Sequence, residues 1–199
     1  MEAGYYIGII GGYFIGSIPF GLLVAQVGGW PDPRQHGSQN IGFTNVLRVA
    51  GKKAGFFTLL GDIGKGFFVT GLGKYFDFSW NLVLLMGAAV IVGHIFSIFL
   101  GFKGGKGVAT AIGAIGGLHW VTGLTLIGIW LISVFVFKYS SGGALAAFGV
   151  FPLLAIFFTR DMAFFWFSVG TMLLIFYCHK GNIIRLYRGL EPKITSNRN

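Results

Sequence analysis

Long apolar runs, separated by short polar segments, make up most of the chain. The runs cover roughly residues 4–28, 54–74, 80–101, 107–137, 143–159 and 162–178. A helix that crosses a bilayer needs about 20 mostly apolar residues, and most of these runs are close to that length. The pattern therefore predicts an all-α, polytopic integral membrane protein. The run 107–137 is long for one span and contains GGLHW, where we expect two shorter helices to join.

Positively charged side chains are concentrated in three polar segments, namely 29–53, the loop 102–106 and the tail after residue 178. Lys and Arg collect in the cytoplasmic loops of membrane proteins. If the N-terminus is outside and the chain crosses seven times, all three segments are cytoplasmic, whereas six crossings would leave the basic tail outside. We therefore predict a seven-transmembrane-helix bundle with the N-terminus outside and the C-terminus cytoplasmic, built as a single domain over residues 1–199.

The composition fits a membrane protein and argues against other classes. Charged residues make up 11% of the chain, hydrophobic residues 54%, and the mean hydropathy is +0.75, whereas soluble domains carry about 25% charged residues. The net charge of +9 fits basic loops that face anionic lipid headgroups, so we expect no nucleic-acid partner. Cys178 is the only cysteine, and no cluster of Cys and His indicates a metal site.

Gly4, Gly8, Gly12 and Gly16 recur at every fourth position of the first run. On a helix they form one smooth ridge, and small residues at such a ridge let a neighbouring helix approach closely. We expect this ridge to be a packing surface rather than a flexible hinge.

The first polar segment, GWPDPRQHGSQNIGFTNVLRVAGKK, is longer than a simple connector, and such loops are often functional. Its hydroxyl, amide and guanidinium groups form a good oxyanion-binding set. The candidate residues are Ser38, Asn40, Thr44, Asn45 and Arg48. The alternative is a solvated loop whose polar residues make turns and start a helix.

The second polar segment, GFKGGKGVAT (Gly101–Thr110), has the composition of a phosphate-binding loop. It does not match the nucleotide P-loop or the dinucleotide-binding pattern, so nucleotide hydrolysis is not indicated. Glycines let backbone N–H groups approach phosphate oxygens, and we expect a helix to begin near Gly107, with its positive N-terminal end at the loop. The candidate residues are Lys103, Gly104, Gly105, Lys106 and Gly107. The alternative is a basic cytoplasmic turn.

The third polar segment, HKGNIIRLYRG, directly follows the last apolar run. His179, Asn182 and Arg185 are spaced three apart and share one face if the helix continues. The alternative is a basic amphipathic tail on the inner leaflet. Under the seven-span topology all three segments lie on the cytoplasmic side, and together they predict a phosphate-binding site at the bilayer surface.

Three polar side chains lie inside the apolar runs. Asp62 and Lys65, spaced i and i+3, are able to pair, and His94 lies in the third run. Charged residues inside a membrane are functional candidates by default, but a structural ion pair explains them equally well. A transporter for a phosphorylated solute is the rival class, although transporters place their polar site near the bilayer midplane.

Several motifs together identify a family. GSIPFG, GSQNIGFTNVLRVAGKKAG, GDIGKG, GHIFSIFLGFKGGKGVAT and HKGNIIRL occur in this order over most of the chain. In sequence and spacing they resemble the bacterial acyl-phosphate:glycerol-3-phosphate acyltransferases. The resemblance implies that an acyl group moves from acyl phosphate to the 1-hydroxyl of sn-glycerol 3-phosphate, giving lysophosphatidic acid and phosphate in the first acylation of phospholipid synthesis. No histidine of the chain has an Asp five residues later, which agrees with the lack of an HxxxxD motif in this family.

The resemblance also implies roles for the candidate residues. Catalytic roles fall on Ser38, Arg48, Lys106, His179 and Asn182. Substrate-binding roles fall on Asn40, Thr44, Asn45, Lys103, Gly104, Gly105, Gly107 and Ser141. We expect no metal, no organic cofactor and no obligatory protein partner. The substrates are acyl phosphate and glycerol 3-phosphate, and membrane lipid surrounds the protein.

The proton of the glycerol hydroxyl has two candidate acceptors, His179 or a phosphate oxygen of the acyl donor. We favour the phosphate, because no carboxylate is placed to orient the histidine, and we interpret Glu191 as a structural residue that pairs with an arginine of the tail. A covalent acyl-enzyme is not expected, since acyl phosphate is already activated and no Ser-His-Asp set surrounds Ser38. The expected location is the bacterial inner membrane, as a multi-pass protein whose active site faces the cytoplasm.

Overall fold

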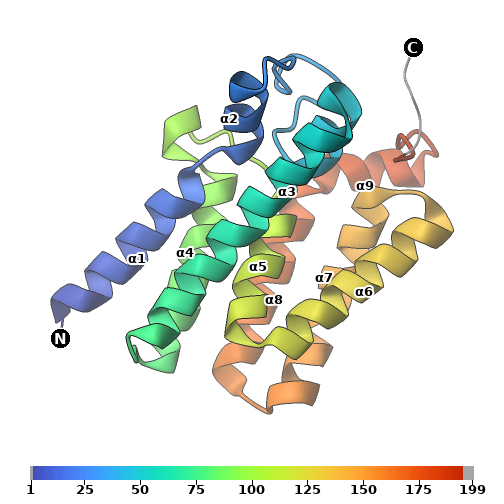
Figure 1. The fold of residues 1–199 in the computed structure, drawn as a ribbon. Coiled ribbons are helices and arrows are strands. Elements are labelled where there is room, and N and C mark those ends of the chain that lie inside the picture. Colours follow the sequence, from blue (N-terminus) through green and yellow to red (C-terminus); the bar gives the residue numbers. More distant parts are fainter. Residues whose placement is uncertain (1, 195–199) are drawn as a thin grey trace. The chain divides into compact units, whose positions relative to one another are not determined.

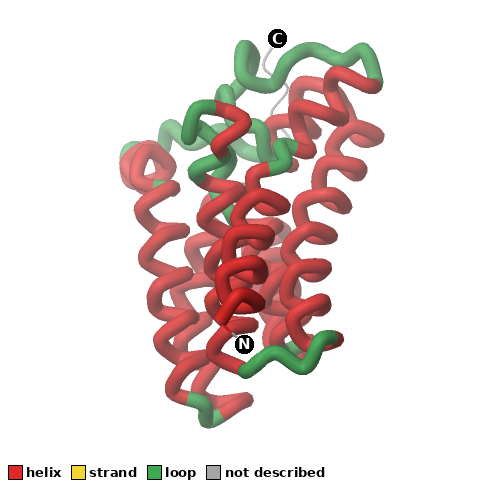
Figure 2. Tube along the Cα trace, turned by 90° about the vertical axis from the view of Figure 1, so that its left-hand side faces the viewer, coloured by secondary structure: helices red, strands yellow, loops and turns green. Residues whose placement is uncertain are grey.

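The computed structural model describes residues 2–194, and these residues form helices connected by loops, with no strand in that range (Figures 1 and 2). In chain order the elements are α1 (Glu2–Ser17), α2 (Phe20–Val27), α3 (Phe43–Tyr75), α4 (Trp80–Ile95), the 3-10 turn η1 (Ile98–Leu100), α5 (Val108–Leu118), α6 (Trp120–Phe137), α7 (Ser140–Thr159), α8 (Met162–Cys178) and α9 (Lys180–Tyr187). The all-α prediction is confirmed for the described residues.

The chain divides into two compact units. The first unit ends at Trp120 and contains α1 to α5, and the second begins at Val121 and contains the helices that follow. Each unit has its own buried core. The assignment of residues 1–199 to a single domain remains a prediction.

The predicted glycine ridge is the surface of α1 that packs against α4. A methyl group added at Gly12 would lie 3.2 Å from the carbonyl oxygen of Met86, and one added at Gly16 would overlap the carbonyl oxygen of Val90. The two backbones therefore approach each other directly, which only small residues permit. The packing role is confirmed for these two glycines, while Gly4 faces open space.

Helices α3 and α5 make a second close contact in the first unit. A side chain at Gly66 would overlap the carbonyl oxygen of Thr110, and one at Gly113 would overlap that of Ile63. This contact fixes the position of α5, and the N-terminus of α5 carries the glycine-rich loop.

The second unit has an aromatic core between α7 and α8. Phe148 and Phe151 on α7 and Phe164 on α8 are fully buried. The ring centroids of Phe151 and Phe164 are 5.7 Å apart and their planes are nearly perpendicular, at 78°. This edge-to-face arrangement is the one that aromatic quadrupoles favour.

Several predicted runs are interrupted by breaks. The run 4–28 contains α1 and α2, which are bent by 44°, because Pro19 lacks an amide hydrogen and cannot continue the hydrogen-bond ladder. The run 107–137 divides at His119, which has extended backbone between α5 and α6, so the predicted split within GGLHW is confirmed. Helix α3 begins at Phe43, well before the predicted start at 54, and its helical geometry is broken at Gly51.

The helices long and apolar enough to cross a bilayer identify an integral membrane protein. By length and composition three described helices qualify, namely α4 with its 3-10 extension, α6 and α7. Counting the bent pairs α1–α2 and α8–α9 as one span each raises the number to five. The predicted seven spans would also require α3, which carries several charges, and α5, which is only 11 residues long. The seven-span topology remains a prediction.

Candidate functional site

The loop before α3 is organised by one buried side chain, that of Asn45. Its Oδ1 accepts a hydrogen bond of 2.8 Å from the backbone N–H of Ser38. Its Nδ2 donates to the carbonyl oxygens of Pro33, His36 and Asn40 over 2.9, 3.1 and 2.9 Å. In this structure the polar atoms of Asn45 bind the loop itself. This side chain therefore shapes the candidate site, and its predicted contact with substrate stays a prediction.

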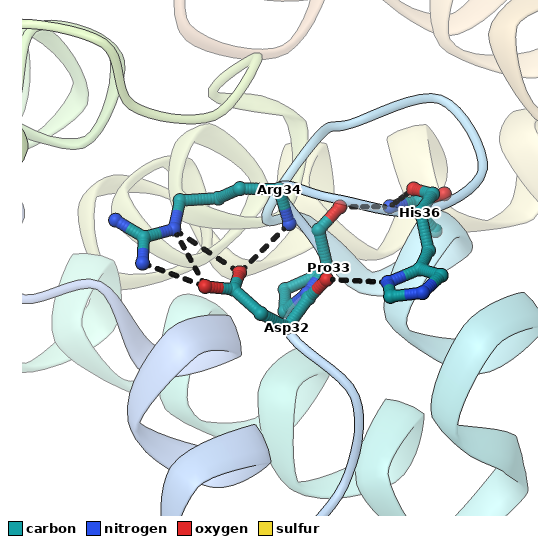
Figure 3. Close-up of polar contacts among 5 residues, drawn as sticks. Asp32, Pro33, Arg34 and His36 are labelled. Atoms are coloured by element: carbon teal, nitrogen blue, oxygen red, sulfur yellow. Dashed lines mark hydrogen bonds and ion pairs between the residues drawn. The ribbon is translucent and has the colours of Figure 1, made fainter.

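The turn at the start of this loop is held by an ion pair (Figure 3). The guanidinium of Arg34 donates to both carboxylate oxygens of Asp32, at 3.1 Å from Nε to Oδ1 and 2.6 Å from Nη2 to Oδ2. The hydrogen bond from Arg34 lowers the pKa of Asp32 below its ordinary value. Nδ1 of His36 lies 3.1 Å from the carbonyl oxygen of Asp32. These contacts hold the turn that leads to Ser38. The guanidinium of Arg34 is paired with the carboxylate of Asp32.

The other candidate residues of this segment lie around the start of α3. The side chain of Ser38 is exposed, and Oδ1 of Asn40 accepts from the backbone N–H of Gly42 at 2.8 Å. Thr44 and Arg48 are partly buried and lie four residues apart on α3, which places them on the same face of the helix. The hydroxyl groups of Ser38 and Thr44 and the guanidinium of Arg48 thus lie within a short stretch of the chain in the first unit.

The segment Gly101–Gly107, here called the glycine loop, connects η1 to α5. Gly101 and Gly107 have positive φ of 57° and 82°, which residues with a side chain rarely adopt. Gly107 caps the N-terminus of α5, where the first backbone N–H groups have no partner within the helix. The expectation of a helix that begins next to Gly107 is confirmed.

Two glycines of the loop use their amides for structure. The N–H of Gly104 donates to the carbonyl oxygen of Ile95 at 2.9 Å, and that of Gly105 donates to the carbonyl oxygen of His94 at 3.0 Å. The amides of Gly104 and Gly105 are thus engaged by the backbone of α4, whereas amides in the first turn of α5 have no acceptor within their own helix. Beside them, Lys103 is exposed and Lys106 is partly buried, so two full positive charges lie next to a helix N-terminus.

In the second unit, His179 lies at the break between α8 and α9, which are bent by 63°. Its side chain is buried, and Nδ1 lies 2.8 Å from the carbonyl oxygen of Ile175. A carbonyl oxygen only accepts, so Nδ1 carries the proton and Nε2 is the basic nitrogen of the neutral ring. A backbone carbonyl therefore orients this histidine. Only a carboxylate was considered for this task from the sequence, so this partner was not predicted.

Glu191 is the centre of a cluster in the second unit. Its Oε1 accepts from Ser141 Oγ at 2.7 Å and from Asn182 Nδ2 at 2.6 Å, and its Oε2 accepts from Arg185 Nε at 2.7 Å. These three hydrogen bonds and the charge of Arg185 outweigh the effect of burial and lower the pKa of Glu191 below its ordinary value. The predicted pairing of Glu191 with an arginine of the tail is confirmed.

Sequence reasoning did not foresee that Glu191 also holds Ser141 and Asn182. Ser141 is 50 residues away along the chain, so no local pattern connects the two. Among residues 2–194, no three His, Cys, Asp or Glu side chains are grouped closely enough to hold a metal ion.

Comparisons with known proteins match almost the whole chain. The family model described as glycerol-3-phosphate acyltransferase matches residues 6–189, a range that includes every predicted site residue. The glycerol-3-phosphate acyltransferase of Paramagnetospirillum magneticum is 45% identical over 93% of this chain and 91% of its own length. That of Neisseria meningitidis serogroup B is 42% identical over 94% of this chain and 95% of its own.

The chain belongs to the glycerol-3-phosphate acyltransferase family.

Solved structures of the same family have a similar fold. The crystal structure of PlsY (YgiH), an integral membrane glycerol 3-phosphate acyltransferase, in its glycerol 3-phosphate form matches with a TM-score of 0.90 and 33% identity, over 96% of this chain and 95% of that one. Its lysophosphatidic acid form matches with a TM-score of 0.87 and 32% identity. The resemblance found in the sequence motifs is therefore confirmed, and so is the integral membrane fold.

Proposed function

We propose that this acyltransferase moves a fatty acyl group from acyl phosphate to the 1-hydroxyl of sn-glycerol 3-phosphate, without a covalent acyl-enzyme. The hydroxyl oxygen attacks the acyl carbon, the bond from that carbon to the phosphate oxygen breaks, and inorganic phosphate leaves with the bonding electron pair. The lipid product is lysophosphatidic acid. This function would make the protein the enzyme of the first acylation in phospholipid synthesis.

The observation that carries the proposal is the geometry of the glycine loop. Gly107, with its φ of 82°, places the N-terminus of α5 beside Lys106. Backbone N–H groups and the helix dipole stabilise an anion at such a position, and lysine adds a full charge. A doubly charged phosphate ester such as glycerol 3-phosphate is the ligand that this arrangement favours.

Two phosphates must come close together in this reaction, so their repulsion has to be offset. We assign Arg48 and Lys106 to this task, since fixed cations also stabilise the oxyanion that develops on the acyl group. Ser38, Asn40 and Thr44 would supply further hydrogen bonds to phosphate oxygens. The other proposed contacts are Asn45, Lys103, Gly104, Gly105, Gly107, Asn182 and Ser141.

The acceptor of the hydroxyl proton is either His179 or a phosphate oxygen of the donor. The hydrogen bond from Nδ1 of His179 to Ile175 leaves Nε2 as the nitrogen able to take a proton, which supports the histidine. It also removes the main argument against it, because a backbone carbonyl can orient an imidazole as a carboxylate does. One variant, His179→Ala, separates the two routes.

We also propose that the site faces the cytoplasm from the bacterial inner membrane. The basic loops support this orientation. A water-soluble phosphate ester would then reach the site from the cytoplasm, while the single-chain donor would enter from the leaflet.

The direct test is to give the detergent-purified protein acyl phosphate and glycerol 3-phosphate and to measure inorganic phosphate and lysophosphatidic acid. We expect equal amounts of both products. If acyl-CoA or acyl carrier protein supports turnover and acyl phosphate does not, the proposed donor is wrong.

Variants test the assigned cations. Lys106→Ala and Arg48→Ala should each lower kcat/KM by about 100-fold or more, as expected for the loss of a group that stabilises transition-state charge. Lys53→Ala, which removes an exposed lysine of α3, is the matched control and should be near normal. A near-normal rate in either test variant would remove that residue from the site.

His179→Ala decides between the two proton acceptors. A general base contributes typically about 100- to 10,000-fold, so a loss in that range supports the histidine. A loss of only several-fold, in a variant that melts at the same temperature as the wild type, supports proton transfer to the phosphate.

A further inference from the structure

Three buried charged or titratable side chains lie in the first unit, and the proposed reaction does not use them. Asp62 and Lys65 on α3 are 2% and 4% exposed, and His94 on α4 is 4% exposed. Lys65 Nζ lies 2.9 Å from Asp62 Oδ1, so the predicted pair forms, as an ion pair rather than a well-aligned hydrogen bond. Nδ1 of His94 lies 3.4 Å from the same oxygen. Such groups are costly inside a membrane protein and call for an explanation.

The glycine loop rests directly on His94. The N–H of Gly105 donates to the His94 carbonyl oxygen at 3.0 Å, and a methyl group added at Gly105 would overlap His94 Nε2. The ring therefore has Asp62 near Nδ1 and the glycine loop beside Nε2. The side chain of His94 occupies the space that a residue larger than glycine would need at position 105.

The same cluster reaches the break between α1 and α2. Lys65 Nζ donates to the carbonyl oxygen of Ile18 at 2.8 Å, and Ser97 Oγ donates to that of Ser17 at 2.6 Å. Carbonyl groups at a helix end lack an intrahelical partner, so these side chains stabilise the break. Lys65 thus connects the break between α1 and α2 to Asp62, and Asp62 in turn contacts His94, which lies against the glycine loop.

These contacts bring together parts of three motifs that the proposed reaction leaves unexplained, namely GSIPFG, GDIGKG and GHIFS. Their side chains would not touch the substrate. Instead they lie around the C-terminal end of α4, whose His94 and Ile95 carbonyl oxygens accept hydrogen bonds from Gly105 and Gly104 of the glycine loop. The arrangement resembles the outer partners of an active site, which fix a binding group in one orientation.

We propose that Asp62, Lys65 and His94 are positioning residues that hold the glycine loop in the shape that receives the phosphate of glycerol 3-phosphate. The proposal rests on the proposed role of the loop in binding that phosphate. Asp62 keeps the ring of His94 in place beside Gly105, and Lys65 balances the charge of Asp62 and ties the cluster to Ile18. The loop can then present Lys106 and the N-terminus of α5 in a fixed geometry.

The test compares His94→Ala with His94→Asn, which keeps an amide nitrogen close to the position of Nδ1. We expect His94→Ala to raise the KM for glycerol 3-phosphate about 10-fold or more, since small displacements of a binding group are costly, and to change the KM for the acyl donor by less than about twofold. His94→Asn should recover part of the loss. Gly64→Ala, at a position of α3 with open space around it, is the control and should behave as wild type.

A second measurement does not depend on turnover. Hydrogen exchange of the backbone amides in peptides covering 101–107 should become faster in His94→Ala and Asp62→Asn, because the N–H groups of Gly104 and Gly105 lose protection. In Gly64→Ala the exchange should be unchanged. Unchanged exchange in a folded His94→Ala protein, together with an unchanged KM for glycerol 3-phosphate, would overturn the proposal.

Gly105→Ala provides a variant within the loop. Its methyl group should displace the loop from His94 and raise the same KM. In the double variant Gly105→Ala/His94→Ala, the KM for glycerol 3-phosphate should rise by clearly less than the product of the two single-variant increases, because both changes act on one contact. Fully multiplicative losses would contradict a shared contact and so overturn the proposal, even if Asp62→Asn fails to fold.

Lys106→Ala separates this proposal from the proposed function. If Lys106→Ala leaves both kcat and the KM for glycerol 3-phosphate normal, the assigned function of the loop fails. The exchange measurement would still report whether Asp62 and His94 hold the loop. If Lys106→Ala loses binding while His94→Ala does not, the loop binds phosphate and the positioning role alone is wrong.

Discussion

At the scale of single residues, Asn45 determines the shape of a loop that supplies several candidate ligands. Its side chain is 2% exposed and binds four backbone groups of that loop. Buried amides of this kind are costly to remove, because the groups they satisfied lose their partners.

We therefore expect Asn45→Ala to lower the free energy of unfolding by about 1–3 kcal/mol and to reduce kcat through the displaced loop. Thermal melting in detergent and the acyltransferase assay measure the two effects. Gln35→Ala, an exposed position of the same loop, should change neither. An Asn45→Ala protein with normal melting and reduced activity would instead indicate that Asn45 contacts the substrate.

Glu191 gives a pH-dependent prediction at the same scale. Burial acts to raise the pKa of Glu191, but the hydrogen bonds from Ser141, Asn182 and Arg185 and the charge of Arg185 together outweigh it, so the pKa in the folded protein is below the ordinary value. A lowered pKa adds stability that is fully present above the ordinary carboxyl pKa and is lost as the pH falls through the folded pKa.

Glu191→Gln should thus melt at a lower temperature than the wild type at neutral pH, by about 2–4 °C for each kcal/mol lost in a chain of this size. The difference should shrink as the pH falls below the ordinary carboxyl pKa toward the lower folded value. Asp77→Asn, an exposed carboxylate, is the control and should show little difference at any pH. A difference that is constant with pH would exclude a role for the charge of Glu191.

Residue types and motifs indicated which side chains matter, but they did not separate contact residues from supporting ones. The substrate contact of Asn45 stays a prediction, and the structure adds a supporting role, since its side chain binds the backbone of the loop. Its partners include Pro33, 12 residues away, and such pairings depend on how the backbone turns. Asp62 and Lys65 were the easier case, since a spacing of three on a helix already brings two side chains together.

At the scale of elements, α3 contains a break that only glycine permits. Gly51 has φ of 84° and ψ of −179°, a backbone region that is essentially restricted to glycine. No atom lies within 4 Å of a methyl group added there. The cost of a side chain at this position is therefore a cost of backbone strain and not of a clash.

Gly51→Ala should lower the free energy of unfolding by about 1–3 kcal/mol. It should also lower activity, because the break sets the direction of the short helix that carries Thr44 and Arg48. Gly64→Ala, on the same helix with equal free space, should be neutral or slightly stabilising, by up to about 1 kcal/mol. Equal melting temperatures for the two variants would show that α3 tolerates a straight course through Gly51.

Helix existence was easier to predict than helix ends. The length and position of the apolar runs predicted where the long helices lie, and GGLHW correctly marked the break between α5 and α6. The early start of α3 at Phe43 lies outside the predicted run, because Thr44, Asn45 and Arg48 interrupt the apolar residues there, and Gly51 with two lysines separates them from the run that begins at 54. The break at His179, bent by 63°, was also missed, since no proline or glycine precedes it.

At the scale of the whole molecule, the seven-span topology makes a prediction that labelling can test. The seven-span prediction places residues 29–53 and the tail on one side of the membrane and the α3–α4 turn on the other. A Cys178→Ala background removes the single native thiol. New cysteines at Gln35, Asp77 and Lys193 then report each side through an impermeant thiol reagent.

We expect Asp77→Cys to react in spheroplasts, and Gln35→Cys and Lys193→Cys to react only in inverted vesicles. Labelling after detergent solubilisation controls for thiols that are buried in the protein. Labelling of Asp77→Cys and Lys193→Cys from the same side would exclude the seven-span topology.

The class of protein, its long helices and its family all follow from the amino-acid sequence. These follow from local properties: hydropathy over about 20 residues identifies a spanning helix, and motif order identifies relatives. The sequence also predicted the phosphate-binding character of GFKGGKGVAT, because glycine and lysine have that chemistry in any fold.

The partners of the polar residues, in contrast, follow from the three-dimensional packing of the chain. The amides of Gly104 and Gly105 donate to carbonyl oxygens of α4, and a carbonyl oxygen orients His179. The side chain of His94 lies against the glycine loop. Each of these depends on which distant groups meet, and a buried polar group must find its partner wherever the fold brings one. Sequence spacing determines such partners only within a helix turn, whereas packing determines them between helices.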